Sequence, residues 1–421
     1  MINPKKYKKK LRILYITPYN FFIPQSGNQQ LMYNLLDSVS HEIICDFAIL
    51  TSFFDENSKR AARENFPCIK NIFIFPHPRL FMEYLFRLQF FLRGYPNSFG
   101  KYKSPSLVEW LKKVESNYDL IHFDWIYSAQ YIKYISKVPS IIVASDCYSL
   151  SASFGLRRSD VNFFRRIYNF LQYLALMNYE KRVLPKFSRV LVVSKKDKNA
   201  LKLISPKSIV ELIKIGCNLP LFRKKNNATK NHIQDKKMLI LGNIDQITIR
   251  EDVLFFLRHS IPVLFKSHPN LHITILGNTS SRDFISFIKK CNDRITHIEY
   301  VDNFRDFLND DWVCVFPQKR STGLQTKVQQ AMASGLPVVG YLDVFNGLDV
   351  IRGHHAYNCR DINLIIKSID ILLSDKNLRK SVGLSASKFI KANFSREVVR
   401  LEITSIYKDV LKDFLIKRTK N

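Results

Sequence analysis

The sequence predicts an α/β protein of two domains, each a doubly wound parallel sheet with helices on both faces. Apolar strand-like runs alternate with helix-like segments along the chain, which is typical of parallel strands joined by helices. A polar stretch near the middle interrupts this alternation. The length of 421 residues fits two domains, and a hydrophobic content of 46% is enough for two cores.

The first half of the chain contains six predicted strands. They are residues 12–17, 43–50, 71–75, 119–124, 140–146 and 189–194. Residues 29–39 are predicted to form a helix, because apolar residues such as Met32 and Leu36 recur on one face. Residues 162–184 are predicted to form a longer helix with aromatic and basic faces.

The composition break divides the chain. Residues 221–237 are polar and charged, and we interpret them as a linker between domains 1–220 and 238–395. The segment 396–421 has the pattern of one long amphipathic helix, which either simply ends the chain or crosses back to brace the first domain. The second domain restarts the alternation with predicted strands at 238–243, 271–278, 297–301, 312–317 and 336–341.

Several protein classes are disfavoured by the sequence. An uninterrupted apolar run of 18 residues does not occur, and the apolar start of the chain breaks at Thr17-Pro18 without a signal-peptide cleavage pattern. The seven cysteines are scattered, with no CxxC pair, which argues against a zinc site and a disulfide framework. We therefore expect a cytoplasmic protein without a bound metal.

The net charge of +29 has two interpretations. A Lys-rich composition can reflect a biased genome, or the charge can serve an anionic partner. Basic clusters at 5–10, 223–225 and 417–420 favour an anionic membrane surface, where each basic residue contributes about 1 kcal/mol. Nucleic acid is less favoured, because no DNA- or RNA-binding motif accompanies the charge. The apolar segment 80–94 is either a membrane contact or a core helix.

The stretch Ser321–Gly340 has the pattern of a loop, a short helix and a strand. Gly323, Lys327 and Gln330 would share one helix face, and Gly335 is a natural stop. A helix start, a close backbone approach at glycine and a nearby cation together suit an anionic phosphate. The alternative is a polar helix face that is merely solvated.

The same stretch resembles the nucleotide-sugar signature of glycosyltransferase family 4, the retaining group 1 transferases of the GT-B fold. Many members have the pattern G-[IL]-x-x-K-x-x-E-A-M-A-x-G-x-P-V-V. The matching residues are Gly323, Leu324, Lys327, Ala331, Met332, Ala333, Gly335, Pro337, Val338 and Val339. Further segments are similar to family elements in the same order, among them "DLIHFDWIYSAQYI", "ASDCYSLS" and "VLVVSKKDKNAL", so the resemblance covers about residues 11 to 405.

The resemblance implies a GT-B fold, with two Rossmann-like domains facing across a cleft, the first for the acceptor and the second for the donor. It implies transfer of a sugar, hexosyltransferase-like and with retention, from a nucleoside-diphosphate-sugar to a glycan or lipid-linked acceptor, as in bacterial surface polysaccharide synthesis. No cofactor or metal is expected, and attachment would be peripheral, on the inner face of the membrane.

The resemblance also assigns site residues. Donor contacts are expected from Gly242, Asn243, Gly277, Lys319, Arg320, Thr322, Gly323, Leu324, Lys327 and Gln330. Acceptor contacts are expected from Gly27, Asn28, His122 and Asp146, and catalytic roles from Lys327, Asp146 and His122. Each acceptor position also has a plain structural interpretation: a capped helix start at 26–28, a buried structural His122, and a helix cap at Asp146.

Departures from the family pattern leave other functions open. Many members carry two glutamates where this chain has Thr322 and Gln330, and Gly242-Asn243 replaces a Gly-Arg element. A glutamine can accept from one ribose hydroxyl and donate to the other, but without the help of a charge. The alternatives are a weak or inactive nucleotide-sugar-binding member, an epimerase on the same fold, and a nucleic-acid binder.

Overall fold

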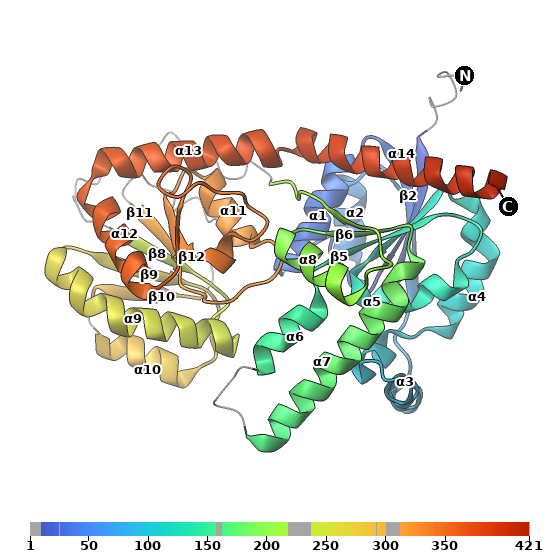
Figure 1. The fold of residues 1–421 in the computed structure, drawn as a ribbon, viewed down its shortest axis with the longest axis horizontal. Coiled ribbons are helices and arrows are strands. Elements are labelled where there is room, and N and C mark those ends of the chain that lie inside the picture. The colour runs from blue at the N-terminus through green and yellow to red at the C-terminus, as the bar shows by residue number, and fades with distance from the viewer. Residues whose placement is uncertain are drawn as a thin grey trace. The chain divides into compact units, whose positions relative to one another are not determined.

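The computed structural model describes residues 10–24, 26–156, 162–217, 237–291, 293–299 and 312–420. The chain divides into two compact units (Figure 1). Unit 1 contains Met1–Gly216 and Arg396–Asn421, and unit 2 contains Cys217–Ser395. The predicted linker 221–237 lies outside the described residues except for Lys237, and so do the basic cluster 223–225 and most of 5–10.

Unit 1 is built on a seven-stranded parallel sheet with the order β3-β2-β1-β4-β5-β6-β7. The strands are β1 Leu11–Thr17, β2 Ile43–Leu50, β3 Ile69–Phe75, β4 Leu120–Asp124, β5 Ser140–Ser145, β6 Arg189–Val192 and β7 Val210–Leu212. The order reverses between β1 and β4, where Ile13 lies opposite Leu120. In doubly wound sheets the carboxyl ends of the strands at such a switch point are where ligands bind.

Helices cover both faces of this sheet. They are α1 Gly27–Val39, α2 Glu56–Asn65, α3 Leu80–Leu92, α4 Pro105–Val114, α5 Trp125–Ser128, α6 Tyr148–Leu156, α7 Phe163–Val183, α8 Lys195–Ile204 and α14 Arg396–Lys420. The alternation along β1 shows the two layers: Leu14 and Ile16 join the core cluster that includes α4 and α7, whereas Tyr15 meets α14 on the other face.

Unit 2 repeats the design with a six-stranded parallel sheet in the order β10-β9-β8-β11-β12-β13. The strands are β8 Lys237–Leu241, β9 His272–Leu276, β10 Ile295–Ile298, β11 Trp312–Phe316, β12 Val338–Tyr341 and β13 Tyr357–Cys359. The helices are α9 Ile247–Ser267, α10 Arg282–Cys291, α11 Thr326–Ala333, α12 Ile362–Ser374 and α13 Lys376–Phe394. Both sheets confirm the predicted α/β class.

Two strands were not predicted from the sequence, namely β7 and β13. Each has three residues and lies at one edge of its sheet. A three-residue edge strand is too short to show a period of two in the sequence. Among the described helices, none is both long and apolar enough to cross a membrane.

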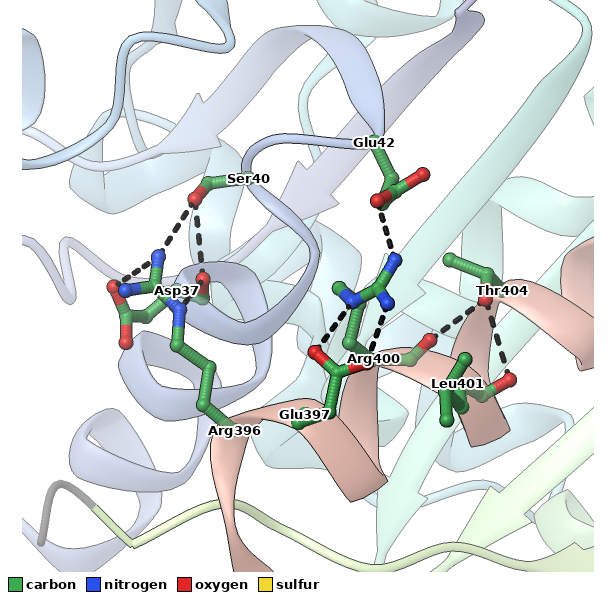
Figure 2. Close-up of polar contacts among 8 residues, drawn as sticks. All are labelled: Asp37, Ser40, Glu42, Arg396, Glu397, Arg400, Leu401 and Thr404. Atoms are coloured by element: carbon green, nitrogen blue, oxygen red, sulfur yellow. Dashed lines mark hydrogen bonds and ion pairs between the residues drawn. The ribbon is translucent and has the colours of Figure 1, made fainter.

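Helix α14 packs on α1 within unit 1, although it follows unit 2 in the sequence. Arg396 donates from Nε to the carbonyl oxygen of Asp37 at 2.8 Å and lies 3.0 Å from its carboxylate (Figure 2). Arg400 lies 2.5 Å from a carboxylate oxygen of Glu42. These contacts lie at the edge of the interface between α14 and the rest of unit 1, and their side chains are partly exposed to water.

The other face of α14 is buried. Val399, Ile403, Tyr407 and Val410 are fully buried and recur at helical spacing. The hydroxyl of Tyr407 lies 3.0 Å from that of Tyr15 and 3.0 Å from Nδ1 of His122. One side chain of α14 is thus hydrogen-bonded to both β1 and β4.

Tyr407→Phe tests this link. The change removes the Tyr407 hydroxyl, so the buried Tyr15 hydroxyl and His122 Nδ1 each lose a hydrogen-bond partner. We expect a loss of about 1–3 kcal/mol in the free energy of unfolding of unit 1, measured by chemical denaturation. Arg400→Ala is the control and should cost less, because its ion pairs are partly exposed. A larger effect of Arg400→Ala would contradict this assignment.

Candidate functional site

The short helix α11 is the centre of the candidate site in unit 2. The loop of residues 317–325 leads from β11 to Thr326, and Gln325 at the N-cap makes no side-chain capping bond. Lys327 is the second residue of the helix; its side chain is exposed, yet the protein atoms around the amine lower its pKa by partial desolvation. In the described residues Lys327 makes no ion pair.

The helix begins later than the sequence pattern suggested. Gly323 and Leu324 lie in the loop before Thr326, so Gly323, Lys327 and Gln330 do not form one continuous helix face. The φ angle of Gly323 is 62°, a left-handed conformation that favours glycine. Gln330 is half-buried, and its side-chain amide has no hydrogen bond to any other described residue.

Two side chains that the sequence analysis missed hold this loop. Gln325 donates to the hydroxyl of Ser321 at 2.5 Å and to the carbonyl oxygen of Thr322 at 3.3 Å. Asn346 donates to the carbonyl oxygen of Ser321 at 2.9 Å. The loop in front of α11 is therefore positioned before any ligand binds.

Gln318 is a further missed residue, at the end of β11. Its Nε2 lies 3.4 Å from the carbonyl oxygen of Leu241, while its Oε1 is buried and has no partner among the described residues. A buried acceptor without a partner costs about 1–3 kcal/mol. Gln318 is therefore a candidate to accept a hydrogen bond from a ligand.

The loops after β8 and β9 meet at two glycines. A Cβ on Gly277 would lie 1.7 Å from the carbonyl oxygen of Gly242, which only glycine allows. Asp245 accepts from the backbone N–H of Ser280 at 2.6 Å and from its hydroxyl at 2.9 Å, so the two loops are also tied by side chains. Asn243 is exposed beside them.

Lys319 and Arg320 follow Gln318 and are both exposed. The backbone N–H of Lys319 donates to Asp252 at 2.9 Å, and its amine lies 3.5 Å from the ring centre of Phe255. Burial raises the pKa of Asp252, and the bond from Lys319 opposes that rise. Of the predicted donor residues, Gly242 and Asn243 thus follow β8, Gly277 follows β9, and Lys319 and Arg320 follow β11.

Two adjacent strand ends of unit 1 carry strained backbone. Trp125 follows β4 with a φ of 54°, and Ser145 ends β5 with a φ of 62°. A non-glycine residue in this region costs about 1–3 kcal/mol and is most often kept at functional sites. The indole nitrogen of Trp125 and the hydroxyl of Ser145 are buried without a partner in the described residues.

The loop after β5 contains Asp146, which is half-exposed. The next residues are held by two buried carboxylates: Asp197 accepts from the N–H of Cys147 at 2.8 Å, and Glu180 accepts from the N–H of Tyr148 at 2.7 Å. The hydroxyl of Ser149 also donates to Glu180. The backbone around Asp146 is therefore fixed from α7 and α8.

His122 is fully buried at 0% exposure. Its Nδ1 contacts Tyr407, and its Nε2 lies 3.3 Å from a carboxylate oxygen of Asp124. Burial raises the pKa of Asp124, and His122 and Thr17 oppose that rise. These contacts agree with a structural histidine, and a role in acceptor binding or catalysis stays a prediction.

Gly27 and Asn28 are exposed at the start of α1. Ser26 caps this helix in a capping box with Gln29, whose side chain also donates to the carbonyl oxygen of Asn20 at 2.9 Å. The capped helix start is present as expected, and contact with an acceptor stays a prediction. Within the described ranges, no group of three or more His, Cys, Asp and Glu residues is placed to hold a metal ion.

The two doubly wound units define a GT-B fold of two Rossmann-like units. Residues 235–375, which include α11, match the family model described as "Glycosyl transferases group 1". A curated relative is the capsular polysaccharide biosynthesis glycosyltransferase CapM of Staphylococcus aureus, 24% identical over 208 residues. That match covers 47% of this chain and 54% of CapM, so the chain spans about half the length of this relative.

Solved structures support the same fold over nearly the whole chain. Sucrose-phosphate synthase from Thermosynechococcus elongatus has a TM-score of 0.69 at 16% identity, covering 96% of this chain and 100% of that one. HepE from Anabaena, in complex with UDP and glucose, has a TM-score of 0.64 at 12% identity, covering 95% and 100%. At these identities the likeness shows the fold alone.

Glu180→Gln tests the clamp on the Asp146 loop. Burial raises the pKa of Glu180 from its ordinary 4.5 to about 7, so the folded protein binds this proton more tightly than the unfolded chain. The resulting stabilisation is fully present below pH 4.5 and is lost as the pH rises to about 7, a change of roughly 3 kcal/mol at most. Glutamine does not titrate and keeps one acceptor oxygen.

We expect the melting temperature of the unchanged protein to fall between pH 5 and pH 8 by several degrees more than that of Glu180→Gln. Thermal denaturation at both pH values measures this. A difference that does not vary with pH would contradict the raised pKa.

Proposed function

We propose that this protein transfers a sugar from a nucleoside-diphosphate-sugar to a hydroxyl of a glycan or lipid-linked acceptor, with retention of the anomeric configuration. The observation that carries the proposal is the start of α11, with Gly323 before it and Lys327 in its first turn, inside the segment that matches the group 1 model. The similarity to CapM favours a role in bacterial surface polysaccharide synthesis.

In the proposed reaction the bond from the sugar C1 to the diphosphate oxygen breaks, and a bond from C1 to the acceptor oxygen forms. Negative charge grows on the leaving diphosphate. The Lys327 ammonium and the backbone N–H groups at the start of α11 would stabilise this charge. The acceptor proton would pass to an oxygen of the leaving phosphate, so no separate base is required.

The amides of Gln318 and Gln330 are proposed to contact the nucleoside of the donor. The unpartnered Oε1 of Gln318 suits a base or ribose donor group, and Gln330 suits a ribose hydroxyl. Because HepE was solved with UDP and glucose, a UDP-sugar is the first donor to test, followed by GDP-, ADP- and dTDP-sugars in a thermal-shift screen.

The acceptor is proposed to bind to unit 1, near Gly27, Asn28 and Asp146. A lipid-linked acceptor would bring the protein to the inner face of the cytoplasmic membrane as a peripheral protein. We also propose that no metal takes part, since Lys327, Lys319 and Arg320 supply positive charge for the diphosphate. Full activity in excess EDTA is expected, and loss restored by Mg²⁺ would contradict metal independence.

One observation favours a second candidate, a weak or inactive donor-binding member. Gln330 is a neutral residue where many family 4 members have a glutamate, which removes a charge-assisted hydrogen bond. Donor binding without transfer or hydrolysis would support this candidate. An epimerase would instead convert the free nucleotide-sugar, which NMR of the products would detect.

Lys327→Ala is the first test of the transfer site. We expect kcat to fall about 10²-fold or more, because a cation that stabilises the leaving group is lost. Radiolabelled sugar transfer to a membrane acceptor fraction measures the rate. Lys266→Ala, an exposed lysine at the end of α9, is the matched control and should keep full activity. Near-normal turnover of Lys327→Ala would refute the assigned role.

The series Gln330→Ala and Gln330→Glu tests the proposed ribose contact. Alanine should weaken donor binding, and glutamate should tighten it about fivefold, the equivalent of roughly 1 kcal/mol gained from a charged acceptor. Isothermal titration with the donor identified by the screen measures both values of Kd. An unchanged Kd and KM for Gln330→Ala would show that this side chain does not touch the donor.

A further inference from the structure

Helices α3 and α7 of unit 1 expose large apolar side chains to solvent. In α3 only Phe86 and Phe90 are buried, so the interpretation of 80–94 as a core helix is wrong for most of the segment. Its exposed residues include Phe81 at 72% and Leu92 at 75%. In α7 they include Phe163 at 71% and Phe164 at 80%. Exposed apolar surface of this kind marks an interaction site.

A cavity of about 830 Å³ lies where the carboxyl ends of α3 and α7 meet. Leu92 of α3 is part of its lining, so the cavity is continuous with the exposed apolar surface. Asn178 of α7 donates to the carbonyl oxygens of Arg93 at 3.3 Å and Gly94 at 2.8 Å. The rings of Tyr95 and Tyr179 meet edge to face at 5.0 Å. The two helix ends are thus fixed around the cavity.

The cavity is strongly basic. Five of its lining residues are cationic, and none of the described residues that line it is acidic; the cations are Arg93, Lys103, Lys133, Arg182 and Lys186. The amine of Lys103 lies 4.3 Å from the ring centre of Phe86, and that of Lys133 lies 4.7 Å from the ring centre of Tyr134. The amines of Lys103 and Lys133 therefore lie near aromatic rings, and no carboxylate lines the cavity beside them in the described residues.

The positive charges act on one another. Burial lowers the pKa of Lys103, and the neighbouring charges of Lys133 and Arg93 lower it further. An anion in the cavity would relieve this repulsion. Lys103 is tied to Gln89 of α3 at 2.8 Å, so its amine is held near the cavity while the net charge stays uncompensated.

Tyr179 gives a second, independent sign of a ligand. It lines the cavity and is 1% exposed, and its hydroxyl has no hydrogen-bond partner among the described residues. Burial raises the pKa of this phenol, so it stays a neutral O–H donor at physiological pH. A buried donor without a partner is costly, and a ligand oxygen would satisfy it.

We propose that this cavity binds the phosphate headgroup of an anionic membrane lipid, while the exposed apolar residues of α3 and α7 enter the outer part of the bilayer. The cations surround the phosphate and Tyr179 donates to one of its oxygens. A free phosphate would use the cavity but would leave the adjoining apolar surface in water. A lipid uses both, because its headgroup is anionic and its chains are apolar.

This site rests on the membrane association proposed above and gives it a location in unit 1. Vesicle binding is measured without any sugar donor. Its failure is therefore separate from failure of the transfer reaction. The probes are sonicated vesicles of phosphatidylglycerol with phosphatidylcholine in equal amounts, and vesicles of phosphatidylcholine alone. We expect the full-length protein to sediment with the anionic vesicles and to bind the neutral ones at least about tenfold more weakly.

The test variant is Lys133→Glu with Arg182→Glu, two exposed residues of the cavity. Its affinity for anionic vesicles should fall at least about tenfold. The matched control is Lys202→Glu with Lys207→Glu, which makes the same change in net charge at exposed positions outside the cavity lining. An equal loss in both variants would show a response to net charge only and would overturn the proposal. Lys133→Gln with Arg182→Gln repeats the test if the reversed charges impair folding.

A reporter variant tests entry into the bilayer. Leu92→Trp places an indole at the junction of the cavity and the apolar surface, and its fluorescence should shift to the blue on binding anionic vesicles. An unshifted spectrum with full vesicle binding would overturn the insertion of α3. Two further outcomes would overturn the proposal. A thermal shift with inorganic phosphate that is lost in the cavity variant, without any vesicle binding, would indicate a site for free phosphate. Dimers that are abolished by Phe81→Ser with Phe164→Ser would indicate that the apolar surface is a contact between copies of the protein.

Discussion

The hydroxyl of Tyr407 joins the two strands on which the architecture of unit 1 depends. It contacts Tyr15 of β1 and His122 of β4, and these neighbouring strands form the point where the strand order reverses. The residue that completes this buried contact is 285 positions beyond His122. The packed core of unit 1 therefore includes a contact of very high sequence separation, which is of the kind that slows folding.

The ends of β4 and of its neighbour β5 carry the features that prepare a site. Trp125 and Ser145 keep strained backbone at the ends of β4 and β5, and such strain persists only where the surroundings fix it. The surroundings here include Glu180 and Asp197, which bind successive N–H groups after Asp146. In unit 2 the loop before α11 is fixed in a similar way by Gln325 and Asn346. Both units thus position their candidate residues before a ligand binds.

The fold was largely predictable because buried parallel strands leave continuous apolar runs, as in β2, whose predicted bounds 43–50 are those observed. The position of Lys327 in the first turn of α11 also followed from the sequence. Glu180 and Asn346 did not, since each acts on a loop more than twenty residues away. A lone acidic residue late in the apolar pattern of α7 was the available signal for Glu180. Backbone strain at Ser145 left no signal in the sequence.

The basic composition of the chain explains only part of the charge around the cavity of unit 1. With 65 basic and 36 acidic residues in the chain, five cations without an acid around one cavity are not rare by chance. Composition alone does not explain why those cations lie beside the exposed Leu92, which continues into the apolar surface of α3. It also does not explain a buried tyrosine hydroxyl without a partner in the same lining. An amphiphilic anion accounts for all three features together: the local positive charge, the adjoining apolar surface and the buried hydroxyl without a partner in the described residues.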